Sequence, residues 1–409
     1  RFPLIHARDS TRNKCFNEFF GKGARVQSGD QLEVDITAIA HGGHCIARYD
    51  GRVIFVRHAI PGERVIVEIS DVTKSFARGN CISVIKASKH RVSPPCSYAR
   101  FDGCGGCDFQ HIDLSYQRDL KSEIIKEQFS RLAKMEIDVE VEEVKPNLHW
   151  RSRMEFTVSE NGKVGLYASR SNQIVEIDKC LIAHEDIDIE KINQAKLPKS
   201  KRVDVAITSK GQSAVVIEGR ENLGLIEEQV DDINFSLNPI TFWQSHRMAP
   251  TVLSQVVRDY VQAEPADHIF DLYGGAGLFS AALLSQLGVA GRITLIESDE
   301  NAIIDARRNF ALEPRVEIVE AKVEASLKKY RGANVVLLDP PRAGAGERVI
   351  SSIASLAPRT IVYVACDPAA LARDSAYLAA QGYKLDQIRA FDLFPMTAHM
   401  ELVARFIIS

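Results

Sequence analysis

The sequence of 409 residues predicts an α/β protein whose C-terminal part forms a mostly parallel, doubly wound sheet. From residue 238 onward, apolar runs alternate with helix-like segments, a pattern typical of parallel sheets. Residues 31–87 instead consist of short alternating runs separated by turn signals, which suits a small β-barrel of the OB type. A chain of this length is expected to form two or three compact units.

Composition narrows the classes of partner. The chain has 51 Lys and Arg against 54 Asp and Glu, so the formal net charge of −3 gives no global sign of a nucleic-acid binder. Residues 72–101 carry six basic side chains and no acidic one, a patch that could meet phosphate or simply be a solvated face. No apolar run has the length of a membrane span and no signal peptide is recognisable, so we expect a cytoplasmic protein without membrane contact.

The barrel segment contains the runs "LEVDITAIA", "HGGHCIARYDGRVIFV", "PGERVIVEIS" and "CISVIKAS", with hairpin turns at "YDG" and "IPGE". Barrels of this type commonly present one face to nucleic acid, although the same pattern fits a barrel without a ligand.

The middle of the chain predicts a mixed α+β unit. A cysteine-rich loop, residues 94–110, precedes the amphipathic stretch "SYQRDLKSEIIKEQFSRLAK", which predicts a helix. Later runs predict an antiparallel sheet, with turns at Asn161-Gly162 and Lys210-Gly211. We therefore divide the chain into units at residues 27–88, 89–237 and 238–409, and assign no function to the residues before them.

Cysteines of this loop form a candidate metal site. Eight cysteines in a cytoplasmic protein favour metal ligands or a reactive thiol over a disulfide framework. Cys104 and Cys107 flank Gly-Gly at a spacing that suits one metal centre, with Cys96 nearby, and Cys180 would tie the loop to the predicted sheet. This chemistry leaves zinc and an iron–sulfur cluster equally open. Cysteines without a matching spacing are Cys15, Cys45 and Cys81.

The stretch "FDLYGGAGLFS" predicts a tight glycine turn between a strand and a helix. Gly275 and Gly277 fit a G-x-G pattern without the third glycine of a dinucleotide fingerprint. Glu297 ends the strand "ITLIE", where a carboxylate can accept hydrogen bonds from ribose hydroxyls. Together they indicate an adenosine-bearing ligand, S-adenosylmethionine rather than NAD; a purely structural turn with a surface glutamate is the alternative.

Three further residues could carry chemistry at the same edge of the sheet. Asp339 in "LLDPPRAGAG" ends a buried strand and is held by two prolines, which would also suit an adenine N-methylase. Cys366 in "VYVACDPAALARD" lies between a buried strand and a helix opened by Pro368, where a packed structural thiol is the plain alternative. Glu401 begins the terminal strand.

The thiol of Cys366 and the carboxylate of Glu401 together favour a uracil C5-methylase. A thiolate that adds to C6 of uracil makes C5 nucleophilic toward a methyl sulfonium, and a carboxylate can then remove the C5 proton. An N-methylase needs neither group. Cys366 and Glu401 therefore point to uracil as the substrate base.

With these motifs in view, the chain resembles the S-adenosylmethionine-dependent RNA uracil-5-methyltransferases. The resemblance runs from about residue 27 to the C-terminus and includes, in the family's order, "HGGHCIARYDG…FV…PGE", "CGGCDFQH", "FWQSH", "DLYGGAG", "IES", "DPPRAG", "ACDPAALARD" and "FPMTAHME". It implies an RNA-binding TRAM barrel, a central domain with an iron–sulfur loop and a Rossmann-like methyltransferase domain.

The resemblance also implies roles. Cys366 corresponds to the family's nucleophile and Glu401 to its base. The S-adenosylmethionine site corresponds to Gln244, Tyr273, Gly275, Gly277, Glu297 and Asp339. The ligands of a [4Fe–4S] cluster correspond to Cys96, Cys104, Cys107 and Cys180.

Two departures from the family's pattern stand out. More residues separate Cys96 from Cys104 than in the best-known members, and Asp367 stands where many members have Asn.

For the substrate, the combination of TRAM barrel and cluster implies 23S ribosomal RNA in preference to transfer RNA. We expect the protein to be a monomer. We keep two alternatives: a transfer-RNA uracil-5-methyltransferase, and an inactive metal-bearing RNA-binding assembly factor. The latter would have no need of Cys366, Glu401 and the glycine turn together.

Overall fold

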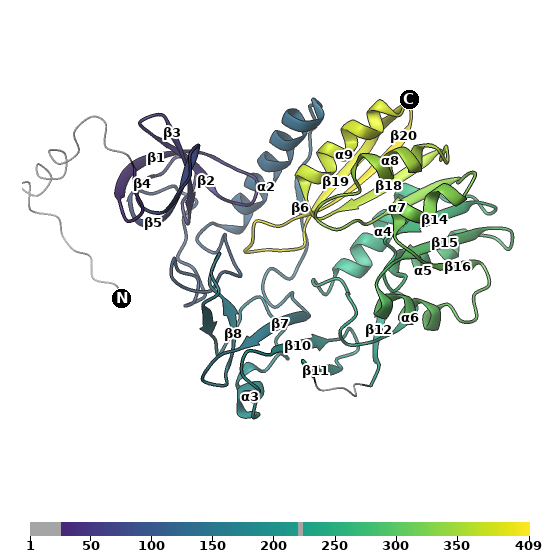
Figure 1. Cartoon of the computed structure of the whole chain (residues 1–409), viewed down its shortest axis with the longest axis horizontal. Coiled ribbons are helices and arrows are strands. Elements are labelled where there is room, and N and C mark those ends of the chain that lie inside the picture. Colours follow the sequence, from purple (N-terminus) through teal and green to yellow (C-terminus); the bar gives the residue numbers. More distant parts are fainter. Residues whose placement is uncertain (1–25, 220–223) are drawn as a thin grey trace, which may run out of the picture. The chain divides into compact units, whose positions relative to one another are not determined.

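The computed structural model describes residues 26–219 and 224–409 (Figure 1). The described residues form two compact units: one comprises residues 26–38 and Cys45–Ser88, the other Ile39–His44 and the described residues from Lys89 to Ser409. Within the described ranges, every helix is too short or too polar to cross a membrane. The predicted boundary between residues 237 and 238 lies inside the larger unit and stays a prediction. Cys15 lies outside the described residues.

The smaller unit contains the predicted barrel. Its described strands close in the order β1-β2-β3-β5-β4. Inward side chains alternate with outward ones, as in β1, where Leu32, Val34 and Ile36 are buried, and Cys45 lies in the same apolar core. The strands are β1 (Gln31–Ile39), β2 (Cys45–Tyr49), β3 (Arg52–Arg57), β4 (Arg64–Val72) and β5 (Phe76–Lys86).

The larger unit begins with the predicted helix and antiparallel sheet. Helix α2 (Leu114–Gln128) starts at Asp113, whose side chain accepts a hydrogen bond from the Tyr116 amide, and it ends in a π-helical turn, Phe129–Ala133. A five-stranded sheet follows in the order β11-β10-β7-β8-β9. Its strands are β7 (Arg153–Val158), β8 (Val164–Tyr167), β9 (Ile174–Glu176), β10 (Arg202–Ile207) and β11 (Ser213–Ile217), with α3 (Ile189–Gln194) between β9 and β10.

The predicted doubly wound sheet is present, and in the described chain it has eight strands in the order β16-β15-β14-β17-β18-β20-β19-β6. β14 pairs in parallel with both β15 and β17, whereas β20 runs antiparallel to its neighbours. The strands from the C-terminal part are β14 (His268–Leu272), β15 (Arg292–Glu297), β16 (Val316–Glu320), β17 (Val335–Leu338), β18 (Thr360–Ala365), β19 (Tyr383–Asp392) and β20 (Glu401–Ile408).

Helices connect these strands, and α8 and α9 lie side by side next to β18 (Figure 1). The strand order reverses between β14 and β17, so the carboxyl ends of these two strands flank a crevice of the kind that binds ligands in open α/β sheets. The helices are α4 (Ala249–Val261), α5 (Leu278–Leu283), α6 (Glu300–Asn309), α7 (Val323–Ser326), α8 (Gly346–Ala354) and α9 (Pro368–Ala380).

Three strands of the described residues were not predicted from the sequence. β6 (Val141–Glu143) comes from the predicted central unit but pairs with β19 at the edge of the large sheet. It is anchored by Arg389, whose Nε and Nη2 donate to Glu142 at 2.7 Å each. β12 (Ile226–Val230) and β13 (Ile233–Leu237) form a separate hairpin. A three-residue edge strand leaves almost no periodicity, because distant pairing and not its own sequence stabilises it.

Candidate active site

Cys366 and Glu401 come from adjacent antiparallel strands. Ala365, the last residue of β18, pairs with Leu402 of β20, so one step further Cys366 stands opposite Glu401. Directly opposed residues of antiparallel strands lie on the same face, within reach of each other's side chains. Cys366 is half-buried and Glu401 is 4% exposed. The structure therefore brings the candidate nucleophile and the candidate base together.

Asp339 lies at the same edge. It follows β17 directly, and its amide donates to the Leu272 carbonyl at the end of β14, at 3.2 Å. On the other side of β17, Leu338 pairs with Tyr363 of β18. The Asp339 carboxyl thus lies at the strand-order switch, between the glycine turn after β14 and Cys366 after β18.

Burial shapes the protonation of the acidic groups here. Desolvation, reinforced by the charges of Asp271 and Glu297, raises the pKa of Asp339 to about 7. Desolvation and then Asp339 raise the pKa of Glu401 well above its usual value. Desolvation likewise raises the pKa of Asp271 to about 6, against the hydrogen bonds that its carboxylate accepts from the Ser280 amide and hydroxyl. Asp339 and Asp271 are therefore suited to exchange a proton near neutral pH, and Glu401 binds its proton more tightly than an exposed glutamate does.

The surroundings of Cys366 favour the neutral thiol over the thiolate. Burial, together with the negative charges of Glu401 and Asp339, raises its pKa to about 12, whereas Arg342 acts in the opposite direction. Because the thiolate is the nucleophilic form, reaction at Cys366 requires a cation close to the sulfur or loss of the thiol proton to a neighbour. A bound methyl sulfonium would supply such a positive charge.

Asp367, next to Cys366, caps helix α9. Its Oδ1 accepts a hydrogen bond from the Ala370 amide at 2.8 Å, and Oδ2 lies 2.9 Å from Nε2 of His41, a residue of the Ile39–His44 segment of the same unit. These hydrogen bonds lower the pKa of Asp367, although burial opposes them, and the bond to Asp367 raises the pKa of His41. Asp367 therefore caps the N-terminus of α9 and is also hydrogen-bonded to His41.

The glycine turn and Glu297 form the second part of the site. The Gly275 amide donates to Glu297 Oε2 at 3.0 Å, and the Asp299 amide donates to Oε1 at 2.8 Å. A Cβ at Gly277 would collide with the ring of Phe310, whereas one at Gly275 would meet nothing within 4 Å. Gly277 thus serves close packing, and Gly275 (φ 55°) faces open space beside the carboxylate. Tyr273, with φ 61°, opens the turn.

Gln244 is not joined to these groups. Its loop is fixed by the buried Asp305, which accepts hydrogen bonds from the Asn238 amide at 2.8 Å and the Thr241 hydroxyl at 2.6 Å. Gln244 lines a cavity of about 260 Å³ together with Trp243. In the described residues, no hydrogen bond or ion pair connects it with Glu297 or Cys366.

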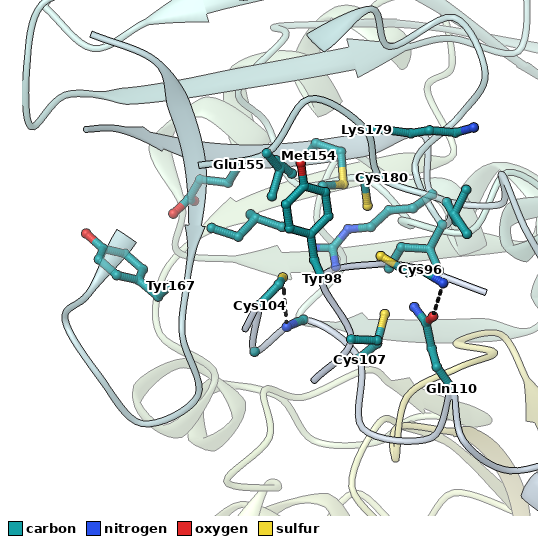
Figure 2. A pocket seen from close by; sticks show the side chains of 18 residues that line it. Cys96, Tyr98, Cys104, Cys107, Gln110, Met154, Glu155, Tyr167, Lys179 and Cys180 are labelled. Carbon is teal, nitrogen blue, oxygen red and sulfur yellow. Dashed lines mark hydrogen bonds between the residues drawn. The ribbon is translucent and has the colours of Figure 1, made fainter. Parts of the chain in front are cut away.

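The four candidate metal ligands line one cavity of about 210 Å³. Figure 2 shows the sulfur atoms of Cys96, Cys104, Cys107 and Cys180 around this space, with the Gly106 amide donating to Cys104 Sγ at 3.3 Å. Burial raises the pKa of Cys104 and Cys180, and that of Cys107 to about 12. Nowhere in residues 26–219 or 224–409 do three Cys, His, Asp or Glu side chains form a group that could hold a single metal ion.

Two polar residues in the segments that follow β17 and β18 were not predicted from the sequence. Arg342 lies in "DPPRAG" and is exposed, and Asp374, in "ALARD", is fully buried. Both belong to quoted motifs, and the available signal for Asp374 was a carboxylate on a helix whose other residues are mostly apolar, since a buried carboxylate requires partners.

Two family models match the chain. Residues 25–82 match the TRAM domain, and residues 176–405 match tRNA (uracil-5-)-methyltransferase. Uncharacterized RNA methyltransferases of Streptomyces avermitilis and Streptomyces coelicolor are 37% and 36% identical to it. Both alignments cover 92% of this chain; they cover 98% of the S. avermitilis protein and 92% of the S. coelicolor protein.

A solved structure has a similar fold. The tRNA (uracil-54, C5)-methyltransferase of Pyrococcus abyssi, in complex with S-adenosyl-L-homocysteine, superposes with a TM-score of 0.73 over 92% of this chain and 99% of its own. Its sequence is 23% identical, so this likeness concerns the fold alone.

Proposed function

Because this chain belongs to the tRNA (uracil-5-)-methyltransferase family, we propose that it methylates C5 of a uridine in RNA through a covalent bond between Cys366 and C6 of the base. Family membership makes it an S-adenosylmethionine-dependent RNA methyltransferase. The observation that carries the proposal for its mechanism is the opposed placement of Cys366 and Glu401 beside Asp339.

The reaction divides into steps that these residues serve. The Cys366 thiolate adds to C6, and the electron pair moves into the ring so that C5 becomes nucleophilic. C5 attacks the methyl carbon of S-adenosylmethionine, which leaves as neutral S-adenosylhomocysteine. Glu401 then takes the C5 proton, the C5–C6 double bond returns, and the thiolate leaves. A carboxylate with a raised pKa is a stronger base than an exposed one, which suits this proton transfer.

The glycine turn supplies the binding side of the proposal. Glu297 is held by backbone amides at the end of β15, where it can accept hydrogen bonds from the two ribose hydroxyls of S-adenosylmethionine. Open space at Gly275 lets the ligand approach the backbone. Tyr273, Gln244 and Asp339 complete the proposed ligand contacts, of which Gln244 is the one without a described link to the rest.

The cysteine cavity fits a [4Fe–4S] cluster better than a zinc ion. Zinc needs its ligand atoms about 2.3 Å from one point, whereas the four thiols here are among the side chains that line a cavity of about 210 Å³ and do not converge on a single-ion site. When bound, such a cluster would covalently link Cys96, Cys104, Cys107 and Cys180. Methyl transfer by the steps above needs no electron transfer, so we assign the cysteine site a structural role.

Packing indicates what this role is. Cys107 and Cys180 contact a small apolar cluster built on Trp150, Ile182 and Met396. Met396 lies in the loop that leads to Glu401, and its carbonyl accepts a hydrogen bond from the amide of Phe109, two residues after Cys107. The cysteine site therefore supports the loop that carries the proposed base.

We place the target uridine in 23S ribosomal RNA. The support is the family resemblance of a chain that combines a TRAM barrel with a cysteine loop. Transfer RNA is the second candidate, because the matching family model and the P. abyssi enzyme are both named for it. Either RNA offers a loop in which a base can be unstacked and turned into a pocket.

Methylation of defined RNAs tests this assignment. Purified protein is incubated with S-adenosylmethionine and either 23S ribosomal RNA fragments or transfer RNA, both transcribed without modification, and nucleosides are analysed by mass spectrometry. We expect 5-methyluridine in a ribosomal fragment. Product in transfer RNA alone would reverse the substrate assignment, and N-methylated adenosine in place of 5-methyluridine would overturn the proposed chemistry.

A further inference from the structure

One buried carboxylate ties the loop after β17 to helix α9. Asp374, fully buried on α9, accepts three hydrogen bonds at Oδ2: from the Ala345 amide at 2.7 Å, the Gly346 amide at 3.1 Å and the Tyr363 hydroxyl at 2.8 Å. A buried carboxylate is tolerated only when its oxygens are well bonded. The hydrogen bonds that offset the desolvation cost of the Asp374 carboxylate therefore also fix this loop.

Arg373 strengthens the same attachment. Its Nε and Nη2 donate to Asp374 Oδ1 at 3.1 and 3.0 Å, and Nη2 also donates to the Ala343 carbonyl at 2.7 Å. A Cβ at Gly344 (φ 78°) would lie 2.5 Å from Arg373 Nη2 and 2.7 Å from Asp374 Oδ2. The loop thus approaches α9 as closely as a glycine allows.

The loop carries Arg342, which follows Pro340-Pro341 directly. The prolines restrict the backbone before this residue, and the Asp374 contacts fix the backbone after it. Arg342 is exposed, and within the described parts of the chain its guanidinium has no hydrogen bond or ion pair. β17 pairs in parallel with β18, with Leu338 opposite Tyr363, so the loop that carries Arg342 leaves the same edge of the sheet at which Cys366 follows β18. The positive charge of Arg342 acts to lower the pKa of Cys366, against burial and the charges of Glu401 and Asp339.

Cys366 otherwise faces acidic groups. Glu401 approaches from β20, Asp339 from the end of β17 and Asp367 from the start of α9, and all three disfavour the thiolate. Arg342 opposes them. A nucleophilic thiol in such surroundings depends on a cation held in a fixed place.

We propose that Asp374 is a positioning residue for catalysis: by fastening residues 343–346 to α9, it keeps the Arg342 guanidinium beside Cys366, where the positive charge stabilises the attacking thiolate. This inference rests on the proposed role of Cys366 as nucleophile. It assigns a function to the "ALARD" part of the motif, which the methyl-transfer steps leave unused.

The test is the pH dependence of Cys366 alkylation in the full-length protein without RNA. Iodoacetamide is neutral, and the Cys366 peptide can be followed by mass spectrometry apart from other cysteines. We expect Arg342→Gln and Asp374→Ala each to slow alkylation about tenfold near pH 9, as one unit of thiol pKa would. The double variant should be no slower than Arg342→Gln, and Asp374→Asn, which keeps one acceptor oxygen, should lie between.

Asp267→Ala is the matched control, because Asp267 is also a buried carboxylate bonded to an arginine, Arg359, but precedes β14 at the amino end of the sheet. We expect its variant to lose stability and keep the wild-type alkylation profile. If Asp374→Ala does not fold, Tyr363→Phe, which removes one hydroxyl of the attachment, should slow alkylation roughly threefold.

Wild-type alkylation in folded Asp374→Ala, or in Arg342→Gln, would overturn the positioning role. Trapping of 5-fluorouridine RNA by wild type reports separately on the nucleophile. An alkylation shift without any trapped adduct would refute the proposed function. The effect of Asp374 on the reactivity of the Cys366 thiol would then still stand.

Discussion

At the scale of single residues, the candidate site depends on side chains whose pKa is shifted by burial. Burial raises the pKa of Glu401, which is almost fully buried, and it raises the pKa of the Cys366 thiol. Sequence motifs predicted both positions, since each lies at a strand end. Sequence could not predict their pKa shifts, because these depend on burial and on neighbouring charges that only the fold brings together, above all that of Asp339.

Glu401→Gln separates the two halves of the proposed reaction. Without the base, C6 addition and methyl transfer still occur but the C5 proton stays, so a methylated Cys366–RNA adduct should accumulate with unmodified RNA. Turnover should fall by about 10² to 10⁴, the usual contribution of a general base. Denaturing electrophoresis with methyl-labelled S-adenosylmethionine detects the adduct.

The control is Glu63→Gln, which alters another buried glutamate, one that accepts a hydrogen bond from the Ile60 amide in the barrel. It should neither accumulate an adduct nor lose turnover to this degree. Full turnover by Glu401→Gln would exclude Glu401 as the base.

Two glycines of one turn should respond differently to substitution by alanine. Gly277→Ala combines a positive φ with a collision against Phe310, so it should lower the free energy of unfolding by the left-handed backbone cost of about 1 to 2 kcal/mol plus about 1 to 3 kcal/mol of overpacking. Gly275→Ala should cost the backbone contribution alone but weaken S-adenosylmethionine binding, because its methyl group enters the open space beside Glu297. Urea unfolding and calorimetric titration measure the two effects, and equal losses of stability would count against this distinction.

At the scale of elements, sequence predicted those whose pattern is local. The barrel, helix α2, the antiparallel sheet and the strand–helix alternation follow from periodicity and turn residues, and the observed elements confirm them. β6 and the β12–β13 hairpin were missed, because β6 is stabilised by a distant partner and the hairpin is short and rich in polar residues. In the same way, no sequence pattern predicts that α2 is hydrogen-bonded to the loop before Glu401.

A buried ion pair connects α2 with that loop. Lys121 Nζ donates to Asp392 Oδ1 at 2.6 Å and to the Phe394 carbonyl at 3.2 Å, and both charged side chains are fully buried. Burial lowers the pKa of Lys121, although Asp392 opposes this change.

Lys121→Met should therefore lower the free energy of unfolding by about 3 to 5 kcal/mol, since it leaves a buried carboxylate unpaired. Adding Asp392→Leu should restore much of this loss, which a double-mutant cycle by urea unfolding measures. Strictly additive losses would mean that the pair does not act as a unit.

At the scale of the whole molecule, the proposal links three functions: a TRAM barrel, a cysteine site that supports the base-bearing loop, and a sheet edge that carries the reaction. The motif order along the chain predicted these components. How the cysteine cavity connects with the Glu401 loop depends on packing between Trp150 and Met396, which are far apart in the sequence, so no local pattern predicts it.

Loss of one cysteine of the site should reduce solubility and RNA binding more than it reduces the rate of methyl transfer. Cys104→Ser should lower iron and sulfide content, solubility and RNA binding, while RNA that still binds is methylated at a rate within about threefold of wild type. Cys81→Ser, which alters a half-buried thiol of the barrel, is the control and should change none of these. Unchanged solubility and RNA binding in an iron-free Cys104→Ser protein would contradict a structural role for the site.

Trapping with 5-fluorouridine tests the central claim most directly. The anaerobically purified protein is mixed with S-adenosylmethionine and an RNA fragment whose target uridines carry fluorine at C5, and the mixture is run on a denaturing gel. Fluorine cannot leave as a cation, so the account predicts a stable protein–RNA band with wild type and none with Cys366→Ala. A wild-type enzyme that methylates ordinary RNA but forms no band, or a band that persists in Cys366→Ala, would contradict covalent catalysis by Cys366.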